Sequence, residues 1–369
     1  MTDTGRAGIF AGHQIEAMAR AGAIRAAPFA SGQVQPASLD LRLGRRAFRM
    51  RASFLPQERP VADRIGELAL HEIDLTGGAV LETGCVYLCE LLEGLALPDD
   101  VAASTNPKSS TGRIDVFTRV ICDRARAFDQ IAPGYAGPLY AEISPRTFPA
   151  LVRTGSRLSQ IRFRRGQARL DDAAHRALHA AEALVTSAEP SISGGVAVSV
   201  DLSGFDADGL VGWRAKRHTG LIDVDVTGAC AAEDFWEPIF ARGRAGRRDL
   251  VLDPGEFYIL ASKEAVRVPP DHAAEMTPFD PLVGEFRVHY AGFFDPGFGA
   301  SEAGGAGARA VLEVRSHDVP FILEDGQIVG RLVYERMAER PRTLYGAGLQ
   351  SNYQAQGLKL SKHFRQPAR

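Results

Sequence analysis

The sequence lacks several features by which whole classes of protein are recognised. Its 369 residues include 43 basic and 45 acidic side chains, so a net charge of -2 gives no general attraction to nucleic acid or to an anionic membrane. No apolar run approaches the roughly 20 residues that span a bilayer, and the N-terminus is polar where a signal peptide is basic and then apolar. We expect a cytoplasmic protein without membrane or nucleic-acid partners.

Cysteines and common cofactor motifs are also scarce. Four irregularly spaced cysteines do not predict a disulfide framework, and Cys85 and Cys89 lie in the strand-like run "GCVYLCE", which favours buried thiols over a metal pair. The chain has no G-x-x-x-x-G-K and no G-x-G-x-x-G after a strand, which argues against the common nucleotide folds. None of the nine histidines begins the H-x-E that zinc nucleobase deaminases need, so we expect no zinc and no other bound metal.

What is present is mostly strand and turn. Only "HQIEAMARAGA" near the start and the stretch from Asp171 to Val185 have helical spacing of apolar residues, and the second has Asp at its N-cap position. Elsewhere, short runs rich in Val, Ile, Leu, Tyr and Phe are separated by Gly, Pro and Asp. This pattern predicts a mainly β protein with a few short helices.

An internal repeat divides the chain. "LETGCVYLCELLEGLALPDD" is echoed by "LDPGEFYILASKEAVRVPPD". Three pairs of landmarks are separated by one and the same step in residue number: Gly84 and Gly255, Pro98 and Pro269, Glu142 and Glu313. We therefore predict an N-terminal domain at 1–170, a helical linker at 171–190, and a C-terminal domain at 191–369 that ends in a lid at 340–369.

A polar cluster, Lys108 to Arg113 ("KSSTGR"), distinguishes the two copies. Small polar residues in a turn can offer backbone N–H groups and hydroxyls to phosphate oxygens, while Lys108 and Arg113 add positive charge. At the repeat step, Ser109 corresponds to Asp280 and Arg113 to Gly284. We expect the first copy to be active and the second to be degenerate.

The cluster and "PGYAGPLYAE", Pro133 to Glu142, resemble the shared signature of the trimeric dCTP deaminases and dUTPases. "VQPASLDLRLG" at 34–44 and "NYQAQGLKLS" at 352–361 are similar to further motifs of this family, the second to its C-terminal lid. The resemblance covers most of the chain and matches a double-domain dCTP deaminase subfamily. It implies two tandem dUTPase-like distorted β-barrel (β-clip) domains and a homotrimer in which the arginine loop and the catalytic glutamate come from neighbouring subunits.

The resemblance implies hydrolytic deamination of dCTP to dUTP and ammonia, which supplies dUTP and dUMP for thymidylate synthesis. Glu142 in "YAE" favours deamination over dUTP cleavage, and Mg²⁺ is expected only with the substrate triphosphate. Two alternatives remain open: a bifunctional enzyme that also cleaves the triphosphate to give dUMP, and a nucleotide-binding regulator without catalysis.

The resemblance also implies residue roles. Glu142 is the expected general base and acid, and Ser109 and Arg113 are expected to position water and stabilise charge on the intermediate. Because the chain is longer than the family pattern between Arg113 and Pro133, the residue that meets the sugar cannot be aligned, and Asp129 is the candidate. The other expected nucleotide contacts are Lys108, Ser110, Thr111 and Gly112 at the phosphates, Tyr140 and Ala141 along the base, and Tyr345 and Gln356 from the lid.

Overall fold

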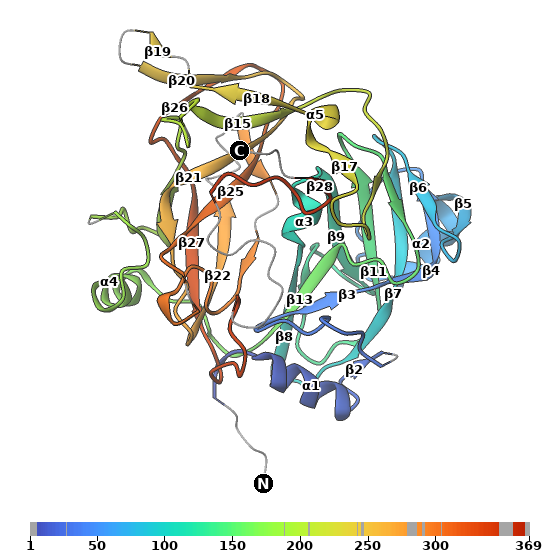
Figure 1. Cartoon of the computed structure of the whole chain (residues 1–369). Helices are drawn as coiled ribbons and strands as arrows, with labels where there is room; N and C mark the ends of the chain where they lie inside the picture. The colour runs from blue at the N-terminus through green and yellow to red at the C-terminus, as the bar shows by residue number, and fades with distance from the viewer. Residues whose placement is uncertain are drawn as a thin grey trace. The chain divides into compact units, whose positions relative to one another are not determined.

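A computed structural model describes most of the chain and divides it into two compact units. The described residues are 6–26, 28–187, 189–205, 207–241, 243–244, 247–278, 286–289, 292–303, 305–346 and 357–365. The first unit comprises Met1–Ala168, Gly220–Cys230 and Met337–Arg342, and the second comprises Arg169–Thr219, Ala231–Arg336 and Thr343–Arg369. Strands dominate both units, which confirms the predicted mainly β class (Figure 1).

The described residues of the first unit form three sheets. Their orders are β1-β13-β8-β10 with β3 beside β13, β5-β4-β7-β11-β9 with β2 beside β7, and β16-β12-β6. The strands are β1 (Gly8–Ile9), β2 (Ile24–Arg25), β3 (Leu39–Leu41), β4 (Leu43–Met50), β5 (Ala69–Asp74), β6 (Ala79–Leu81), β7 (Val86–Ala96), β8 (Val101–Pro107), β9 (Val116–Cys122), β10 (Gln130–Ile131), β11 (Ala136–Pro145), β12 (Ala150–Val152), β13 (Ser159–Arg165) and β16 (Ile222–Asp223). The helices are α1 (Gly12–Arg20), α2 (Val61–Leu68) and α3 (Ser109–Gly112).

The second unit has a closely related set of sheets, ordered β14-β27-β22-β24, β18-β15-β21-β25-β23 and β19-β20-β26. Its strands are β14 (Val196–Ser199), β15 (Leu210–Ala215), β18 (Trp236–Phe240), β19 (Gly243–Arg244), β20 (Arg247–Leu252), β21 (Phe257–Val266), β22 (His272–Pro278), β23 (Phe286–His289), β24 (Phe293–Phe294), β25 (Ala308–Ser316), β26 (Phe321–Glu324), β27 (Ile328–Arg336) and β28 (Phe364–Arg365). The short strand β17 (Cys230–Ala231) lies where the two units meet in the sequence, and the helices are α4 (Asp172–Ala181), α5 (Ala232–Phe235) and the 3-10 turn Ser301–Ala303.

The repeat predicted from the sequence is also seen in individual backbone hydrogen bonds, which occur at equivalent positions in the two units. Gly84 and Gly255 both have a left-handed backbone, with φ of 73° and 72°, a conformation that favours glycine. Their N–H groups donate to Pro145 and Ser316, at 2.9 and 3.2 Å, and these acceptors are separated by the same step as the glycines. The two units therefore share not only strand order but also the register of their turns.

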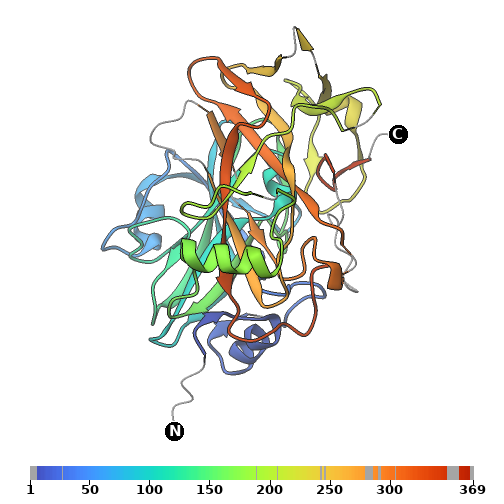
Figure 2. The same cartoon turned by 90° about the vertical axis from the view of Figure 1, so that its left-hand side faces the viewer.

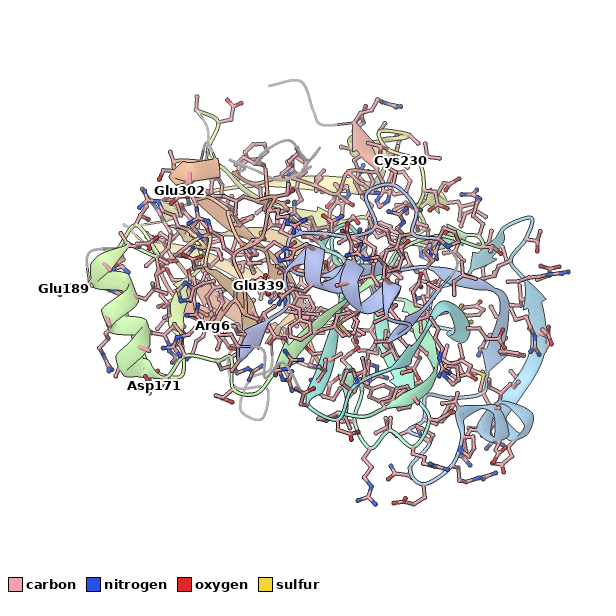
Figure 3. All side chains as sticks on the ribbon, turned by 90° about the horizontal axis from the view of Figure 1, so that it is seen from below. Arg6, Asp171, Glu189, Cys230, Glu302 and Glu339 are labelled. Carbon is pink, nitrogen blue, oxygen red and sulfur yellow. The ribbon has the colours of Figure 1, made fainter. Side chains whose placement is uncertain are left out.

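Helix α4 begins at the N-cap residue that the sequence predicts. The carboxylate of Asp171 accepts from Ala174 N at 2.8 Å, which confirms the predicted N-cap, and Figure 3 labels Asp171 at this end of the helix. Figure 2 shows α4 in front of the strands of the second unit. His175 is buried there and its Nε2 accepts from Tyr334 N of β27 at 3.0 Å, so this histidine has a structural role.

Candidate functional site

The Lys108–Arg113 cluster forms a single tight turn between β8 and β9. The N–H groups of Thr111 and Gly112 both donate to Lys108 O, at 2.8 and 3.0 Å, and Arg113 N–H donates to Ser109 O at 3.1 Å. These three N–H groups therefore hold the turn together. Ser109 is exposed, whereas Arg113 is 2% exposed.

The ammonium group of Lys108 forms an ion pair with Asp40, which comes from the "VQPASLDLRLG" stretch. Asp40 is buried, and Arg157 Nη1 approaches its Oδ2 at 3.8 Å. Two cations therefore share one buried carboxylate. The sequence motif at 34–44 is thus tied to the cluster through charge, a link that no local pattern revealed.

Glu142 lies in the middle of the largest sheet of the first unit. On β11 it faces Leu88 of β7 on one side and Arg119 of β9 on the other. It is 3% exposed, and Arg119 Nη2 donates to its Oε1 at 2.5 Å. Its second oxygen, Oε2, is buried without a hydrogen-bond partner. Among the described residues, the ion-pair partner of Glu142 is therefore Arg119 and not Arg113.

Arg119 is a residue that the sequence reasoning missed. Its guanidinium carbon lies 3.5 Å from the ring centroid of Phe128 and 4.7 Å from that of Phe117, and its Nη2 also donates to Ser53 Oγ at 2.9 Å. Ring faces attract a guanidinium group, so Arg119 is restrained on several sides. Only the cross-strand register, which is not visible in the linear sequence, could have paired it with Glu142.

Tyr140 and Ala141 lie on different faces of β11. Tyr140 is two residues from Glu142 and therefore points to the same side of the sheet, where it packs with Phe48 and Phe54 in a buried cluster. Ala141 is fully buried and lies on the opposite side. The strand therefore brings Tyr140, but not Ala141, to the face of the glutamate.

Asp129, the candidate sugar contact, braces the loop between β9 and β10. Its Oδ1 accepts from Thr105 Oγ1 at 2.6 Å and from Val120 N at 2.8 Å. Removal from water raises its pKa to about 6, and the nearby charge of Glu142 also raises it. Asp129 thus lies close enough to Glu142 for the charge of that carboxylate to affect its pKa. Its Oδ1 accepts two hydrogen bonds that hold the loop in place.

Replacing Asp129 by asparagine should change how stability depends on pH. The folded-state pKa lies above the ordinary value near 3.9, so the folded protein binds the extra proton and gains about 2 to 3 kcal/mol from this group as pH falls from 7 towards 4. Asparagine tolerates the φ of 62° at this position and retains an acceptor oxygen. In urea unfolding at pH 4.5 and 7, Asp129→Asn should lose this difference, and an unchanged difference would contradict the assignment.

The second unit places Glu313 at the matching ladder position. On β25, Glu313 faces Ile259 of β21 on one side and His289 of β23 on the other. It is 5% exposed. At the ladder position that Arg119 occupies in the first unit, the second unit therefore has a histidine.

A Pro-Gly turn precedes β11 in the first unit and β25 in the second. The residue before the proline is Ala132 in the first turn and Asp295 in the second. Tyr135 N–H donates to Ala132 O at 3.3 Å in the first unit, and Phe298 N–H donates to Asp295 O at 3.1 Å in the second. Asp295 is 8% exposed, so the second unit has a buried carboxylate where the first has a methyl group. Each turn is also bonded to the chain just after an earlier strand. Leu97 N–H, after β7, donates to Tyr135 O at 2.8 Å, and Val268 N–H, after β21, donates to Phe298 O at 2.8 Å.

Of the two residues predicted to reach in from the lid, one is described. Tyr345 belongs to the second unit, where its ring lies 5.6 Å from that of Phe298 and its N–H donates to Pro296 O at 2.8 Å. The C-terminal segment thus begins against the turn that carries Asp295. Gln356 lies outside the described residues.

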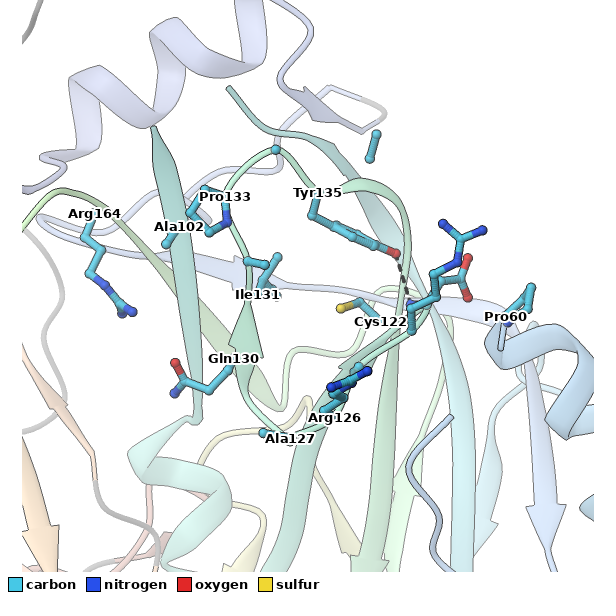
Figure 4. A pocket seen from close by; sticks show the side chains of 16 residues that line it. Pro60, Ala102, Cys122, Arg126, Ala127, Gln130, Ile131, Pro133, Tyr135 and Arg164 are labelled. Atoms are coloured by element: carbon cyan, nitrogen blue, oxygen red, sulfur yellow. Dashed lines mark hydrogen bonds between the residues drawn. The ribbon is translucent and has the colours of Figure 1, made fainter. Parts of the chain in front are cut away.

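A hollow of about 830 Å³ lies elsewhere in the first unit, around the loop that follows β9 (Figure 4). Cys122, Arg126, Ile131, Tyr135 and Arg164 are among its lining residues, and Tyr135 Oη accepts from Asp123 N at 3.2 Å. None of the predicted site residues lines it. The hollow is therefore separate from the predicted active-site residues.

No three His, Cys, Asp or Glu side chains gather as a metal site in the part of the chain that the structure describes. Cys85 and Cys89 are free thiols, and burial raises the pKa of Cys89 to about 12, which suits a buried thiol rather than a ligand. None of the described helices is long and apolar enough to cross a membrane.

Comparisons with known proteins identify the family of the chain. The chain matches the family models of the 2'-deoxycytidine 5'-triphosphate deaminase (DCD) N-terminal domain at residues 6–167 and C-terminal domain at 171–364. It is similar to a crystal structure of 2'-deoxycytidine 5'-triphosphate deaminase from Agrobacterium tumefaciens, with 61% identity, a TM-score of 0.88, and coverage of 93% of this chain and 99% of that one.

Two curated relatives match shorter segments. The dCTP deaminase of Haloarcula marismortui is 33% identical over 140 residues, which is 36% of this chain and 66% of that protein. The "dCTP deaminase, dUMP-forming" of Methanoculleus marisnigri is 32% identical over 155 residues, 41% of this chain and 78% of that protein. The second of these relatives is named for forming dUMP, and the name of the first gives no product.

Proposed function

The chain belongs to the 2'-deoxycytidine 5'-triphosphate deaminase family, and from this premise we propose that it hydrolyses dCTP to dUTP and ammonia. The observation that carries the proposal is a buried glutamate in the middle of the main sheet, Glu142 in the first unit and Glu313 at the same place in the second. A buried carboxylate beside a pyrimidine ring can move protons at neutral pH.

In the proposed reaction the glutamate takes a proton from water as the water oxygen bonds to C4 of cytosine. The C4–N bond then breaks, and the glutamate returns its proton to the departing amine, which leaves as ammonia. Arg113 and Ser109 stabilise the charge of the tetrahedral intermediate and position the water. No step of this scheme requires a resident metal, because the carboxylate activates the water.

Substrate contacts follow from the same scheme. Lys108, Ser110, Thr111 and Gly112 are proposed to line the triphosphate site, and Mg²⁺ enters with the triphosphate as part of the substrate. Lys108 would then be shared between the phosphates and Asp40.

The other contacts depend on which glutamate acts. With Glu142 as the base, Tyr140 is proposed to lie along the ring and Asp129 near the sugar, whereas the side chain of Ala141, on the opposite face of the strand, could take part only through its backbone. Tyr345 and Gln356 are proposed to act from the C-terminal lid.

The proposed assembly is a homotrimer that acts in the cytoplasm, where its deoxynucleotide substrate is found. The first unit supports an arginine supplied from elsewhere, because Glu142 pairs with Arg119 there and not with Arg113. Light scattering on the purified chain should give three times the mass of 39.7 kDa. A monomer that deaminates dCTP would contradict this assembly.

Product analysis tests the proposed reaction. Incubation with dCTP and Mg²⁺ should release one ammonia per dCTP and produce dUTP, resolved by anion-exchange chromatography, at a rate unchanged by a zinc chelator. A dUMP product with pyrophosphate would instead identify the bifunctional reaction. Failure to release ammonia, with dCTP still bound, would support a regulator and contradict the proposal.

A further inference from the structure

We infer that Arg157 binds the triphosphate of dCTP, and that Asp40 positions it beside Lys108 for this contact. The inference rests on the proposed deamination, in which Lys108 meets the phosphates, and it adds a second cation to the phosphate site. Arg157 lies outside the motifs that carry the family resemblance. What singles it out is the buried carboxylate that it shares with Lys108.

The strands of the first unit bring the three residues together. The start of β13 pairs on one side with β3, which carries Asp40, and on the other side with the end of β8, which directly precedes Lys108. Arg157 stands two residues before β13. Lys108 N–H donates to Leu158 O at 2.9 Å, so its backbone is bonded to the residue next to Arg157. The two cationic side chains therefore start from neighbouring segments of the chain.

The group consists of one buried carboxylate and two partly exposed cations. The side chain of Asp40 is 2% exposed, whereas those of Lys108 and Arg157 are 23% and 25% exposed. Lys108 Nζ forms a close ion pair with Asp40 Oδ2, and Arg157 Nη1 lies 3.8 Å from the same oxygen. One negative charge therefore faces two positive charges, and the excess positive charge is accessible to a ligand.

The guanidinium group of Arg157 retains hydrogen-bonding capacity. Its Nη2 donates to Ser31 O at 3.2 Å, and its distance of 3.8 Å from Asp40 is longer than a hydrogen bond. A guanidinium group has five N–H donors, and its planar fork matches two oxygens of a phosphate. Within the described part of the chain, most of these donors have no acceptor and are available to a ligand.

Uncharged residues stand at the equivalent positions of the second unit. In the pairing of β14 with β27, Ala197 takes the place that Asp40 has in the pairing of β3 with β13. The repeat step assigns Ile328 to Arg157. The same sheet therefore forms without these charges, and apolar residues are often at least as stabilising as a buried ion pair. The occurrence of the charges in the unit that has the Lys108–Arg113 cluster favours a role in binding.

A triphosphate is the ligand that this group suits. It carries several negative charges and many acceptor oxygens, so it can contact both cations at once, whereas Asp40 neutralises only one of them. Asp40 also restrains both cationic side chains before the ligand arrives, which reduces the side-chain freedom that binding would otherwise remove. Asp40 is thus a positioning residue, and Lys108 and Arg157 are the residues that contact phosphate.

An uncharged variant of Arg157 tests the contact in the full chain. Arg157→Gln should raise KM for dCTP about ten- to a hundredfold, the loss expected for one charge-assisted hydrogen bond, while kcat stays within about twofold. Glutamine keeps a donor for Ser31 O, and Asp40 keeps Lys108 as its partner, so the variant should fold. Arg164→Gln is the matched control, because Arg164 lines the separate hollow, and it should leave KM unchanged.

Arg157→Lys separates the charge from the fork of donors. It should recover part of the affinity for dCTP, because an ammonium group keeps the charge but presents fewer donors. This variant also serves if Arg157→Gln does not fold. Full affinity in folded Arg157→Lys together with an unfolded Arg157→Gln would then assign Arg157 to the fold and overturn the inference.

Inorganic triphosphate tests Arg157 without the deamination step. In calorimetry on the full chain, Arg157→Gln should bind it about ten- to a hundredfold more weakly, and added KCl should weaken binding less than in the parent, because one cation–phosphate contact is missing. Unchanged KM for dCTP, unchanged affinity for inorganic triphosphate, or a parent chain that does not bind it would overturn the inference. Weaker triphosphate binding by the variant, with no ammonia released by the parent, would instead reject the deamination and retain Arg157 as a phosphate contact.

Discussion

Arg113→Ala should lower kcat/KM for dCTP by about a hundred- to a thousandfold, the loss expected when a donor that stabilises the tetrahedral intermediate is removed. Arg113 belongs to the one cluster that the second copy lacks, and its side chain is 2% exposed. Arg113→Lys should recover only part of the activity, because an ammonium group keeps the charge without the planar fork of donors. Steady-state ammonia release measures both variants.

The matched control is Arg124→Ala, an exposed arginine of the same unit that lines the separate hollow. It should leave kcat/KM unchanged. Added guanidinium ion should partly restore Arg113→Ala if the missing group acts at the reacting atoms. A folded Arg113→Ala variant with normal activity would contradict the proposed role.

Glu93→Ala should reduce the free energy of unfolding by about 3 to 5 kcal/mol, the cost of removing one partner from a buried ion pair. Glu93 is 1% exposed and accepts from Arg42 Nε at 2.7 Å, from Arg42 N at 2.8 Å and from Gln33 Nε2 at 2.8 Å. The substitution removes the carboxylate partner of Arg42, a residue that is itself 8% exposed. Urea unfolding followed by far-UV circular dichroism measures the change.

The repeat provides an internal control for that experiment. Glu264 stands at the position that the repeat step assigns to Glu93, and it accepts from Ser199 N at 2.8 Å and Ser199 Oγ at 2.6 Å, both neutral donors. Glu264→Ala should cost about 1 to 3 kcal/mol, because it leaves no buried cation without its carboxylate. An equal or larger cost at Glu264 would contradict the charge argument.

The Asp40 and Glu142 ion pairs show why some of the site could not be predicted. Lys108 is 68 residues from Asp40, and Arg119 is 23 residues from Glu142. Each pairing depends on which strands lie side by side and in what register, and a shift of one residue would turn the side chains to opposite faces. Residue type alone marked Lys108 and Glu142 as chemically active, but it did not identify what each one contacts.

The mainly β class, the duplication with its constant step, the N-cap at Asp171 and the family could all be predicted from the sequence. These follow from local alternation, from turn residues and from the comparison of one stretch with another, none of which needs long-range contacts. The ion pairs of Arg119 with Glu142 and of Lys108 with Asp40 became visible only in three dimensions. Side chains distant in sequence meet only after the strands have paired, and the register of that pairing determines which charges come together.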